Sequence, residues 1–462
     1  MAVAPNMVRC ACAILVASLE VVSRAGAQTV PGAAPLDRAA LARQVKAEYL
    51  RAWEGYKRTA WGYDEVRPVS GTPRNWYRES MLVTPIDALD GLVLMGCSAE
   101  AESLCAYISA NARWDRDMEV QCFEVIIRCV GGLVASYELT GDRALLASAE
   151  DLARRMLPAF TTPTGMPMRF VNLRTGASRG EISNPAEVGS CILEFGTLTR
   201  HTGDSLFLRT AKRALRELFR RRSALGLVGA GINVVTGEWT DRSASVGCCI
   251  DSYYEYLYKG WLLFGDPELK EMWETHRAAV NTHIARECAA GLYYPRVDMD
   301  TGELLSPTLG ALDAYFPAVL AASGDLSRAR SMQAACYAMW RVHGIEPEFM
   351  DMQTREIPPG QEQYALRPEI VESCYYLYHF TRDEAYLRMG SAMWADLQRY
   401  CRTDIGYTEL ASVVTKKQGD LMHSFLLGET LKYFYLLFTT DPPLAFDEVV
   451  FTTEAHPLRR SR

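Results

Sequence analysis

A short turn recurs along the chain at an almost constant spacing of about 60 residues. Each turn ends in an aspartate, and these are Asp142, Asp204, Asp266, Asp325, Asp383 and Asp441. The successive spacings are 62, 62, 59, 58 and 58 residues. An amphipathic pattern of helical period precedes each turn, and a second helical stretch follows every turn except the last. A repeat of this length predicts a series of helical hairpins, each packing mainly against its neighbours.

The clearest of these patterns is FEVIIRCVGGLVASYELTGD, residues 123–142. Its apolar positions recur at helical spacing, and Glu124 and Arg128 lie four residues apart on a second stripe. Gly141 can end a helix in the left-handed conformation. The pattern therefore predicts one continuous helix that carries a carboxylate and a guanidinium near its start.

An acidic residue lies 11 to 18 residues before each turn. These residues are Glu124, Glu187, Asp251, Asp313, Glu369 with Glu372, and Glu429, and Asp87 with Asp90 marks the entry of an earlier unit. An acid in the first turn of a helix has an ordinary explanation, since it caps the helix and favours the macrodipole. Buried acids, however, are rare unless they are paired or functional. Seven units with acids at one end favour a closed α/α ring over an open solenoid. The acids would then form a functional site at one end of the ring.

The segments between the helical patterns are long and contain alternating residues with Thr-Gly turns. Examples are residues 161–180, GLVGAGINVVTGEWT and GLYYPRVDMDTGELL. Alternation bounded by glycine turns predicts β-hairpins. We therefore expect an all-α fold of seven helical hairpins with small β-hairpin decorations at one end of the ring.

The N-terminus has the features of a signal peptide. Arg9 precedes a short apolar run, and Ala25-Gly26-Ala27 is a small-residue cleavage site. This predicts a signal peptide over residues 1–27, a single domain over 28–462 and export, to a periplasm, to the exterior or to a eukaryotic ER lumen. No later segment reaches about 18 uninterrupted apolar residues, which argues against stable membrane insertion. The net charge of −7 without a long basic run argues against nucleic acid as a partner.

The cysteines leave at least one thiol without a partner inside the mature chain. Thirteen are present, and removal of Cys10 and Cys12 with the signal peptide leaves eleven, an odd number. One thiol is then free or pairs with another molecule, which makes a thiol partner a reasonable hypothesis. The Cys248-Cys249 pair and the Cys122/Cys129 pair lie in apolar patterns of helical type, which predicts buried, inert thiols.

Nine segments together resemble glycoside hydrolase family 47, the class I α-1,2-mannosidases. They are AWEGYKRTAWGYDEVRPVSG, TPIDALDGL, FEVIIRCVGGLVASYELTGD, MLPAFTTPTGMP, NPAEVGSCILEF, DSYYEYLYKGWLLFGD, ALRPEIVESCYYLYHFTRD, SFLLGETLKYFYLLF and VFTTEAHPL. They run from about residue 51 to residue 458 in the order and spacing of the family. LDAYFPAVLAASGD and GIEPEFMD resemble the ER degradation-enhancing mannosidase-like branch more closely than the Golgi-type enzymes.

The resemblance implies an (α/α)7 barrel, a bound calcium ion and hydrolysis of terminal α-1,2-linked mannose with inversion. Inversion requires a carboxylic acid that protonates the leaving oxygen and a carboxylate that activates water. By resemblance, Glu124 is the general acid and Glu369 the general base. Asp251 is a third essential carboxylate and an alternative acid, and Glu348 is a further acid of the catalytic pocket. The expected substrate is a high-mannose oligosaccharide or glycoprotein.

The resemblance also implies the groups that bind the substrate and the metal. The substrate-binding residues are Arg128, Arg367, Glu372 and Glu454. Arg128 and Arg367 can also pair with the catalytic acids and tune their pKa values. Thr453 is the calcium ligand, through its hydroxyl and its backbone carbonyl. Since calcium takes 6–8 oxygen ligands, waters and sugar hydroxyls complete the coordination.

The chain departs from the family pattern at several positions. His423 stands where the family usually has an acid, and Thr452 replaces a usual Asn before Thr453. The motif before Asp251 reads VGCCID, where Gly and Ala are more usual, and Ala314 replaces one partner of the Golgi-type cysteine pair. Every catalytic acid that the resemblance implies is present.

Two other functions stay open at this stage. The first is a lectin-like protein that binds mannose glycans with little or no hydrolysis. The second is another α/α-toroid enzyme, acting on different glycosides or on uronates. The catalytic carboxylates argue against the former and the C-terminal calcium motif against the latter.

Overall fold

The computed structural model describes residues 36–460. The expected signal peptide, residues 1–27, lies outside the described residues, and so does the start of the expected domain at residue 28. Both stay predictions. Among the described residues, no helix is both long enough and apolar enough to cross a membrane.

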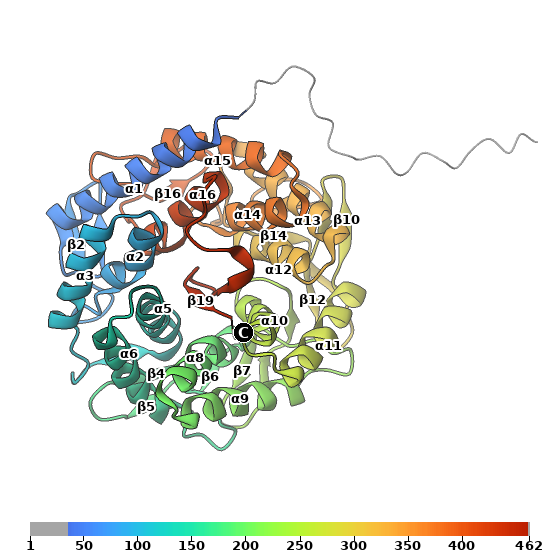
Figure 1. Cartoon of the computed structure of the whole chain (residues 1–462). Helices are drawn as coiled ribbons and strands as arrows, with labels where there is room; N and C mark the ends of the chain where they lie inside the picture. The colour runs from blue at the N-terminus through green and yellow to red at the C-terminus, as the bar shows by residue number, and fades with distance from the viewer. Residues whose placement is uncertain (1–35, 461–462) are drawn as a thin grey trace, which may run out of the picture. The chain divides into compact units, whose positions relative to one another are not determined.

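Paired helices form a ring, with one helix of each pair inside and one outside (Figure 1). The inner helices are α2 (Val83–Leu94), α5 (Gly131–Thr140), α8 (Ile192–Thr202), α10 (Asp251–Phe264), α12 (Phe316–Ala322), α14 (Glu369–Thr381) and α16 (Leu431–Phe438). The outer helices are α1 (Arg38–Ala60), α3 (Ser98–Asn111), α6 (Arg143–Met156), α9 (Ser205–Arg220), α11 (Pro267–His283), α13 (Leu326–His343) and α15 (Ala385–Cys401). Shorter segments are α4 (Cys122–Glu124), α7 (Pro185–Gly189), the 3-10 helices η2 (Leu157–Phe160), η3 (Ala311–Tyr315) and η5 (Phe446–Glu448), and the π-helices η1 (Val125–Val130) and η4 (Leu426–Thr430).

The first and last helical segments close the ring. Helix α1 packs on α16, and α2 packs on both α5 and η4. Each remaining inner helix packs on the next one, from α5 through α8, α10, α12 and α14 to α16. The expected fold of seven helical hairpins in a closed α/α barrel is therefore confirmed.

The repeated turn has the same physical role at three corners of the ring. Gly141, Gly203 and Gly265 end inner helices in the left-handed conformation, which glycine adopts without a steric cost. The aspartate that follows each glycine begins the outer helix, and its side chain accepts a hydrogen bond from a backbone amide of the first turn. The Gly-Asp pair thus reverses the chain between an inner and an outer helix.

Short antiparallel strands decorate the ring. Two-stranded sheets are β1 (Glu65–Arg67) with β2 (Thr72–Arg74), β10 (Arg286–Cys288) with β11 (Gly291–Tyr293), β14 (Thr308–Gly310) with β15 (Phe349–Asp351), β16 (Leu410–Ser412) with β17 (Lys417–Gln418), and β18 (Val449–Phe451) with β19 (Pro457–Arg459). Three-stranded sheets are β3 (Glu119–Gln121), β4 (Phe170–Asn172), β5 (Ser178–Arg179); β6 (Ile182–Ser183), β7 (Gly231–Asn233), β8 (Trp239–Asp241); and β9 (Ser243–Ala244), β12 (Arg296–Asp298), β13 (Leu304–Ser306). The hairpins expected at the Thr-Gly turns are β4–β5, β7–β8 and β12–β13, and all three are present.

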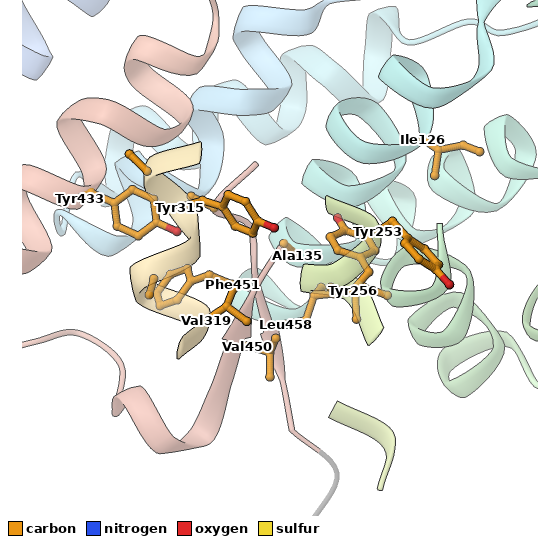
Figure 2. Close-up of a cluster of buried hydrophobic side chains, with 14 of the residues drawn as sticks. Ile126, Ala135, Tyr253, Tyr256, Tyr315, Val319, Tyr433, Val450, Phe451 and Leu458 are labelled. Atoms are coloured by element: carbon orange, nitrogen blue, oxygen red, sulfur yellow. The ribbon is translucent and has the colours of Figure 1, made fainter. Parts of the chain in front are cut away.

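The C-terminal hairpin β18–β19 fills the inside of the ring (Figure 1). Strand β18 packs against α10 and β19 against α5. Its side chains Val450, Phe451 and Leu458 are buried among tyrosines of the inner helices, such as Tyr433 (Figure 2). The ring centroids of Tyr433 and Phe451 are 6.0 Å apart. Because this hairpin is buried and apolar, it closes the barrel from within and leaves one polar end.

The helix predicted over residues 123–142 is continuous in the structure, over residues 122–140, but it is not α-helical throughout. The chain forms α4, then the π-helix η1 over Val125–Val130, and only then the α-helix α5. A π-helical turn adds a residue to each hydrogen-bonded ring, which hydrophobic periodicity alone does not reveal. A second π-helix, η4, contains Glu429. Both π-helices lie beside the cavity described next.

Candidate active site

A cavity of about 410 Å³ opens at the end of the barrel where the acidic residues gather. The carboxylic acids that line it are Glu124, Glu187, Asp251, Glu255, Glu369, Glu372, Glu429 and Glu454. The hairpin between β18 and β19 contributes Thr453 and Glu454 to its wall. The predicted gathering of repeat acids at one mouth therefore holds for five of the hairpin units.

The acids of the other two units lie behind the wall of the cavity. Asp313 is buried and accepts a hydrogen bond from the Gly310 amide at 2.7 Å. Asp87 lies 3.8 Å from the Arg128 guanidinium, and Asp90 pairs with Lys432 deeper in the barrel. In these units the acid has the structural role that helix capping and charge pairing predict.

Arg128 joins acids from three separate elements. Its Nε donates to Glu124 Oε2 at 2.8 Å, and its Nη1 pairs with Glu454 and lies near Asp87. Burial disfavours the guanidinium charge, but Glu454 and the other surrounding acids hold the pKa of Arg128 above its usual range. The guanidinium also lies over the ring of Phe425, 5.6 Å from its centroid. Arg128 thus fixes Glu124 relative to the hairpin.

Glu369 begins α14 and lies beside Arg367. Burial raises the pKa of Glu369 to about 7, although Arg367 opposes the rise. Arg367 pairs with Glu348 at 2.6 Å, and Glu348 itself is not among the residues that line the cavity. Leu366 has a φ of 64°, a left-handed conformation uncommon for a branched side chain, and its carbonyl accepts from the Thr430 hydroxyl at 2.6 Å. This strained turn presents Arg367 and Glu369 to the cavity.

Asp251 is the first residue of α10 and lies at the wall of the cavity. Its Oδ1 accepts from the Ser252 amide at 2.8 Å, and its carbonyl accepts from the Tyr315 hydroxyl at 2.9 Å. Burial raises the pKa of Asp251 well above its ordinary value; the Cys248 thiol and the acid Glu255 add to the rise, and the hydrogen bond from the Ser252 amide opposes it. A carboxyl group with a raised pKa keeps a proton that it can donate.

A buried lysine under the cavity floor was not predicted from the sequence. Lys259 pairs with Glu255 one turn before it on α10 and lies 3.7 Å from Glu372. Burial raises the pKa of Glu372 to about 8, while Lys259 opposes the rise. The signal was available, since Asp251, Glu255 and Lys259 follow one another at four-residue spacing on an inner helix.

Thr453 occupies the turn of the C-terminal hairpin, which carries it into the cavity wall. The Thr452 amide donates to the His456 carbonyl at 2.9 Å, which closes the turn. The Thr453 amide donates to the Tyr256 hydroxyl at 3.3 Å, and that hydroxyl donates to Glu194 at 2.7 Å. Burial raises the pKa of Glu194 to about 8, which keeps this acid neutral beneath the turn at neutral pH.

His423, the departure from the family pattern, lies behind Phe425. Its ring stacks on Phe425 with centroids 4.8 Å apart and an interplanar angle of 6°. Its nitrogens lie 3.6 Å from Glu65 and 3.2 Å from Glu409. Burial lowers its pKa, but these two acids outweigh burial and raise it overall. His423 therefore supports an aromatic side chain of the cavity without lining the cavity.

The prediction that Cys248 and Cys249 are buried in a helical segment is wrong, and their inertness stays a prediction. The two residues lie in a turn before α10, are half-buried and line the cavity. Apolar neighbours in the sequence concealed the turn, since periodicity does not distinguish a helix from a short turn that precedes one. Cys122 and Cys129 are buried, as expected.

The fold and the site together define an α/α-barrel enzyme. Several carboxyl groups line one cavity, and the C-terminal hairpin closes the barrel beneath it. Opposed acid and base carboxyl groups are the chemistry of glycoside hydrolysis. The family model of glycosyl hydrolase family 47 matches residues 48–460. The chain belongs to glycosyl hydrolase family 47, and the predicted resemblance and enzyme class are confirmed.

The individual relatives agree with this assignment. The chain is 39% identical to an alpha-mannosidase I of Arabidopsis thaliana over 90% of its length and 69% of that protein. It is 34% identical to the ER degradation-enhancing alpha-mannosidase-like protein 2 of Homo sapiens, over 94% of the chain and 80% of that protein. Among solved structures, an α-1,2-mannosidase from Trichoderma reesei matches with a TM-score of 0.83 and 25% identity, over 92% of this chain and 99% of that one.

Proposed function

We propose that this chain is a calcium-dependent, exo-acting α-1,2-mannosidase that removes terminal mannose from high-mannose glycans with inversion. One observation carries the proposal above the others. A cavity closed from below by the C-terminal hairpin gathers carboxyl groups from Glu124, Asp251 and Glu369, on three separate inner segments. The names of the relatives supply the sugar and the linkage.

Closure by the hairpin is the basis for exo action. The buried strands β18 and β19 occupy the barrel beneath the cavity. A glycan chain cannot pass through a filled barrel, so only a chain end can enter. The volume of about 410 Å³ lies in the range of roughly 300–1,000 Å³ that is typical of small-ligand sites.

The carboxyl groups divide into proton donors and a base. In this proposal Glu124 or Asp251 donates a proton to the leaving oxygen, and Glu369 takes a proton from the attacking water. The raised pKa of Asp251 favours it as the group that holds the proton. Glu124, held by Arg128, remains the donor that the family resemblance implies.

The positive groups orient these acids and the sugar. Arg128 and Arg367 present guanidinium groups to the cavity, and each is fixed by an acid, Glu124 and Glu348 respectively. A fork of N–H donors suits sugar hydroxyls and carboxylates equally. We expect Glu372 and Glu454, which also line the cavity, to accept hydrogen bonds from sugar hydroxyls.

The residues around Thr453 fit a calcium ion. The nearby donors are oxygens, Thr453 itself with Glu429 and Glu454, and hard oxygen donors are what calcium prefers. Glu429 and Glu454 are buried side by side, and burial and their mutual proximity raise the pKa of Glu429 well above its ordinary value. Among residues 36–460, no three His, Cys, Asp or Glu side chains form a metal-binding group, so Thr453 would hold the ion with waters and sugar hydroxyls. When bound, calcium would supply positive charge to the crowded carboxylates and grip the sugar ring.

The family assignment also bears on the cell compartment and on rival functions. We infer export into an ER-type or periplasmic compartment, supported by the ER proteins among the relatives. The lectin-like alternative shares the same cavity, and it requires binding of mannose glycans without product.

One assay tests the proposal. Purified protein is mixed with α-1,2-mannobiose and calcium, and the anomeric protons of the products are followed by NMR. We expect release of β-mannose first, and loss of activity with a chelator or in Thr453→Ala. No product from mannobiose or from a high-mannose glycan would overturn the proposal, and glycan binding in the same sample would establish the lectin instead. First appearance of α-mannose would overturn inversion alone.

A further inference from the structure

The cavity contains a pair of adjacent thiols that the proposed hydrolysis does not use. The Sγ atoms of Cys248 and Cys249 lie 3.4 Å apart, and both cysteines are free and half-buried. Asp251 follows two residues later and lines the same wall. A group attached to either thiol would therefore stand where a sugar must enter.

The backbone holds the two thiols in this position. The amides of Ile250 and Asp251 both donate to the Gly247 carbonyl at 3.0 Å, which closes a tight turn over the cysteines. Cys249 has a φ of 76°, in the left-handed region that residues with a Cβ rarely adopt. Its carbonyl accepts from the Ala186 amide at 2.9 Å, which fixes the strained residue. Strained residues of this kind persist where their surroundings determine them, and they cluster at functional sites.

The electrostatic surroundings make the two thiols unequal. The hydrogen bond between the two thiols, in which either sulfur can be the donor, lowers the pKa of Cys249; Arg296 also lowers it, whereas burial, Asp251 and Glu187 oppose the change. The same hydrogen bond raises the pKa of Cys248. Cys249 is the one thiol whose pKa is lowered in the described part of the chain. A thiolate with a neighbouring thiol is the arrangement of redox-reactive cysteine pairs.

We propose that Cys248 and Cys249 form a redox-sensitive modification site that reacts with low-molecular-weight disulfides and thereby blocks the cavity. The Cys249 thiolate attacks one sulfur of the disulfide, which breaks its S–S bond, forms a mixed disulfide and releases one thiolate. Cys248 then loses its proton to water and attacks the Cys249 sulfur, which expels the second thiolate. In balance, two protein thiols are oxidised to one Cys248–Cys249 disulfide, and one small disulfide is reduced to two thiols.

Both products interfere with the site. The mixed disulfide fills space beside Asp251, and the protein disulfide reshapes the turn from which Asp251 begins α10. The effect on hydrolysis rests on the proposed function, whereas the chemistry of the thiol pair does not. Mapping of the modified peptide and measurement of activity therefore test separate statements.

The experiment treats the full chain with oxidised glutathione and compares it with three variants. Cys248→Ser and Cys249→Ser remove each partner, and Cys288→Ser removes a half-exposed thiol in β10 outside the cavity as a matched control. Each sample is mapped by peptide mass spectrometry and assayed on α-1,2-mannobiose before and after treatment. Each activity is compared with that of the same untreated variant, so basal differences do not matter.

We expect wild type to lose two hydrogens in the Cys248–Cys249 peptide and most of its activity, with recovery by dithiothreitol. Cys248→Ser should stop at the glutathione adduct on Cys249, Cys249→Ser should resist both changes, and Cys288→Ser should behave as wild type. Modification that maps elsewhere, or equal rates at Cys249 and Cys288, would overturn the site. A mapped disulfide with unchanged hydrolysis would overturn the blocking role. If untreated protein hydrolyses no glycan, the proposed function fails and the mapping still decides the thiol chemistry.

Discussion

Two groups of buried acids lie inside the ring, and they differ in how their charge is balanced. The ionic cluster of Asp90, Lys432 and His456 is completely buried. Asp90 lies 2.7 Å from Lys432 Nζ and 2.8 Å from His456 Nδ1. Burial alone would raise the pKa of Asp90, but these two cations outweigh burial and lower it. In the cavity, by contrast, acids outnumber cations, and burial raises the pKa values of Asp251 and Glu369.

The difference separates a structural role from a functional one. The charge of Asp90 is balanced by two buried cations, and through His456, the residue before β19, Asp90 links the C-terminal hairpin to the inner helices. Acids crowded without matched cations cost folding free energy, because each charged form is desolvated and repelled by the others. Such a cost is a recurrent feature of sites where protons are transferred or cations bound. Substitutions in the cavity should therefore mainly affect catalysis, and substitutions in the ionic cluster should mainly affect stability.

The largest expected effect is on catalysis, from Glu369→Gln in the cavity. Glutamine keeps the shape but cannot take a proton from water, so kcat should fall by about 10²–10⁴-fold. The free energy of unfolding should stay the same or rise, because the substitution removes one of several acids that repel each other in the cavity. The measurements are mannobiose hydrolysis and urea unfolding.

Glu187→Gln is the matched control for this substitution. Glu187 lines the same cavity, but Gln121, Ser183 and Arg169 occupy its carboxylate. We expect a much smaller loss of kcat from it. Equal losses in the two variants would mean that Glu369 has no special role, and a clear loss of stability in Glu369→Gln would contradict the contrast between the two groups.

The next effect is on stability, from Asp90→Asn in the ionic cluster. The substitution leaves two buried cations without their counter-charge, which should lower the free energy of unfolding by about 3–5 kcal/mol. Glu119→Gln, which breaks the exposed pair with Arg179, should leave the free energy of unfolding nearly unchanged and is the control. An Asp90→Asn protein as stable as wild type would show that the cluster is not what holds the hairpin.

Stability should also fall as the pH rises, because of His456. Burial disfavours its charge, but Asp90 and Asp87 outweigh burial and raise its pKa to about 9, above the unfolded value of about 6.5. The folded state therefore binds the proton more tightly, which stabilises it fully below pH 6.5. That stabilisation is lost as pH passes through 9, by about 2 kcal/mol between pH 7 and 9.

Urea unfolding at several pH values, in wild type and in His456→Gln, measures this contribution. Glu194 adds a fall in the same direction, since burial raises its pKa to about 8. The variant should therefore keep a shallower pH dependence, without the part that belongs to His456. Identical slopes in the two proteins would assign the whole dependence to other groups.

The sequence was sufficient for the ring because its repeat is local. The Gly-Asp turn needs only two adjacent residues to end one helix and begin the next, so its spacing reveals the hairpins directly. The positions of the acids near the starts of the inner helices could be predicted from the same spacing. Asp313 and Asp90 could not be separated from the cavity acids, because their pairing partners come from distant parts of the chain.

Two further features depended on backbone detail that periodicity does not contain. The π-helix that carries Arg128 has the same apolar spacing as an ordinary helix over one turn. The turn at Cys248 and Cys249 is set by the Gly247 carbonyl and by a hydrogen bond from the Ala186 amide, which lies far earlier in the sequence and is adjacent only in space. Sequence patterns report faces of helices well and the exact path between them poorly.

The smallest effect concerns Glu348, which the family resemblance implies is a pocket acid. In the structure it pairs with Arg367 at 2.6 Å and is not among the residues that line the cavity. Its action is then to position Arg367 beside Glu369. Glu348→Gln should weaken this partly exposed pair by about 1 kcal/mol and lower kcat about fivefold. Glu348→Asp, which keeps the charge, should restore part of the loss, and the measurement is kcat and KM on mannobiose for both variants. A loss as large as that of Glu369→Gln would instead make Glu348 a catalytic acid, and would extend the unbalanced group of carboxyls beyond the wall of the cavity.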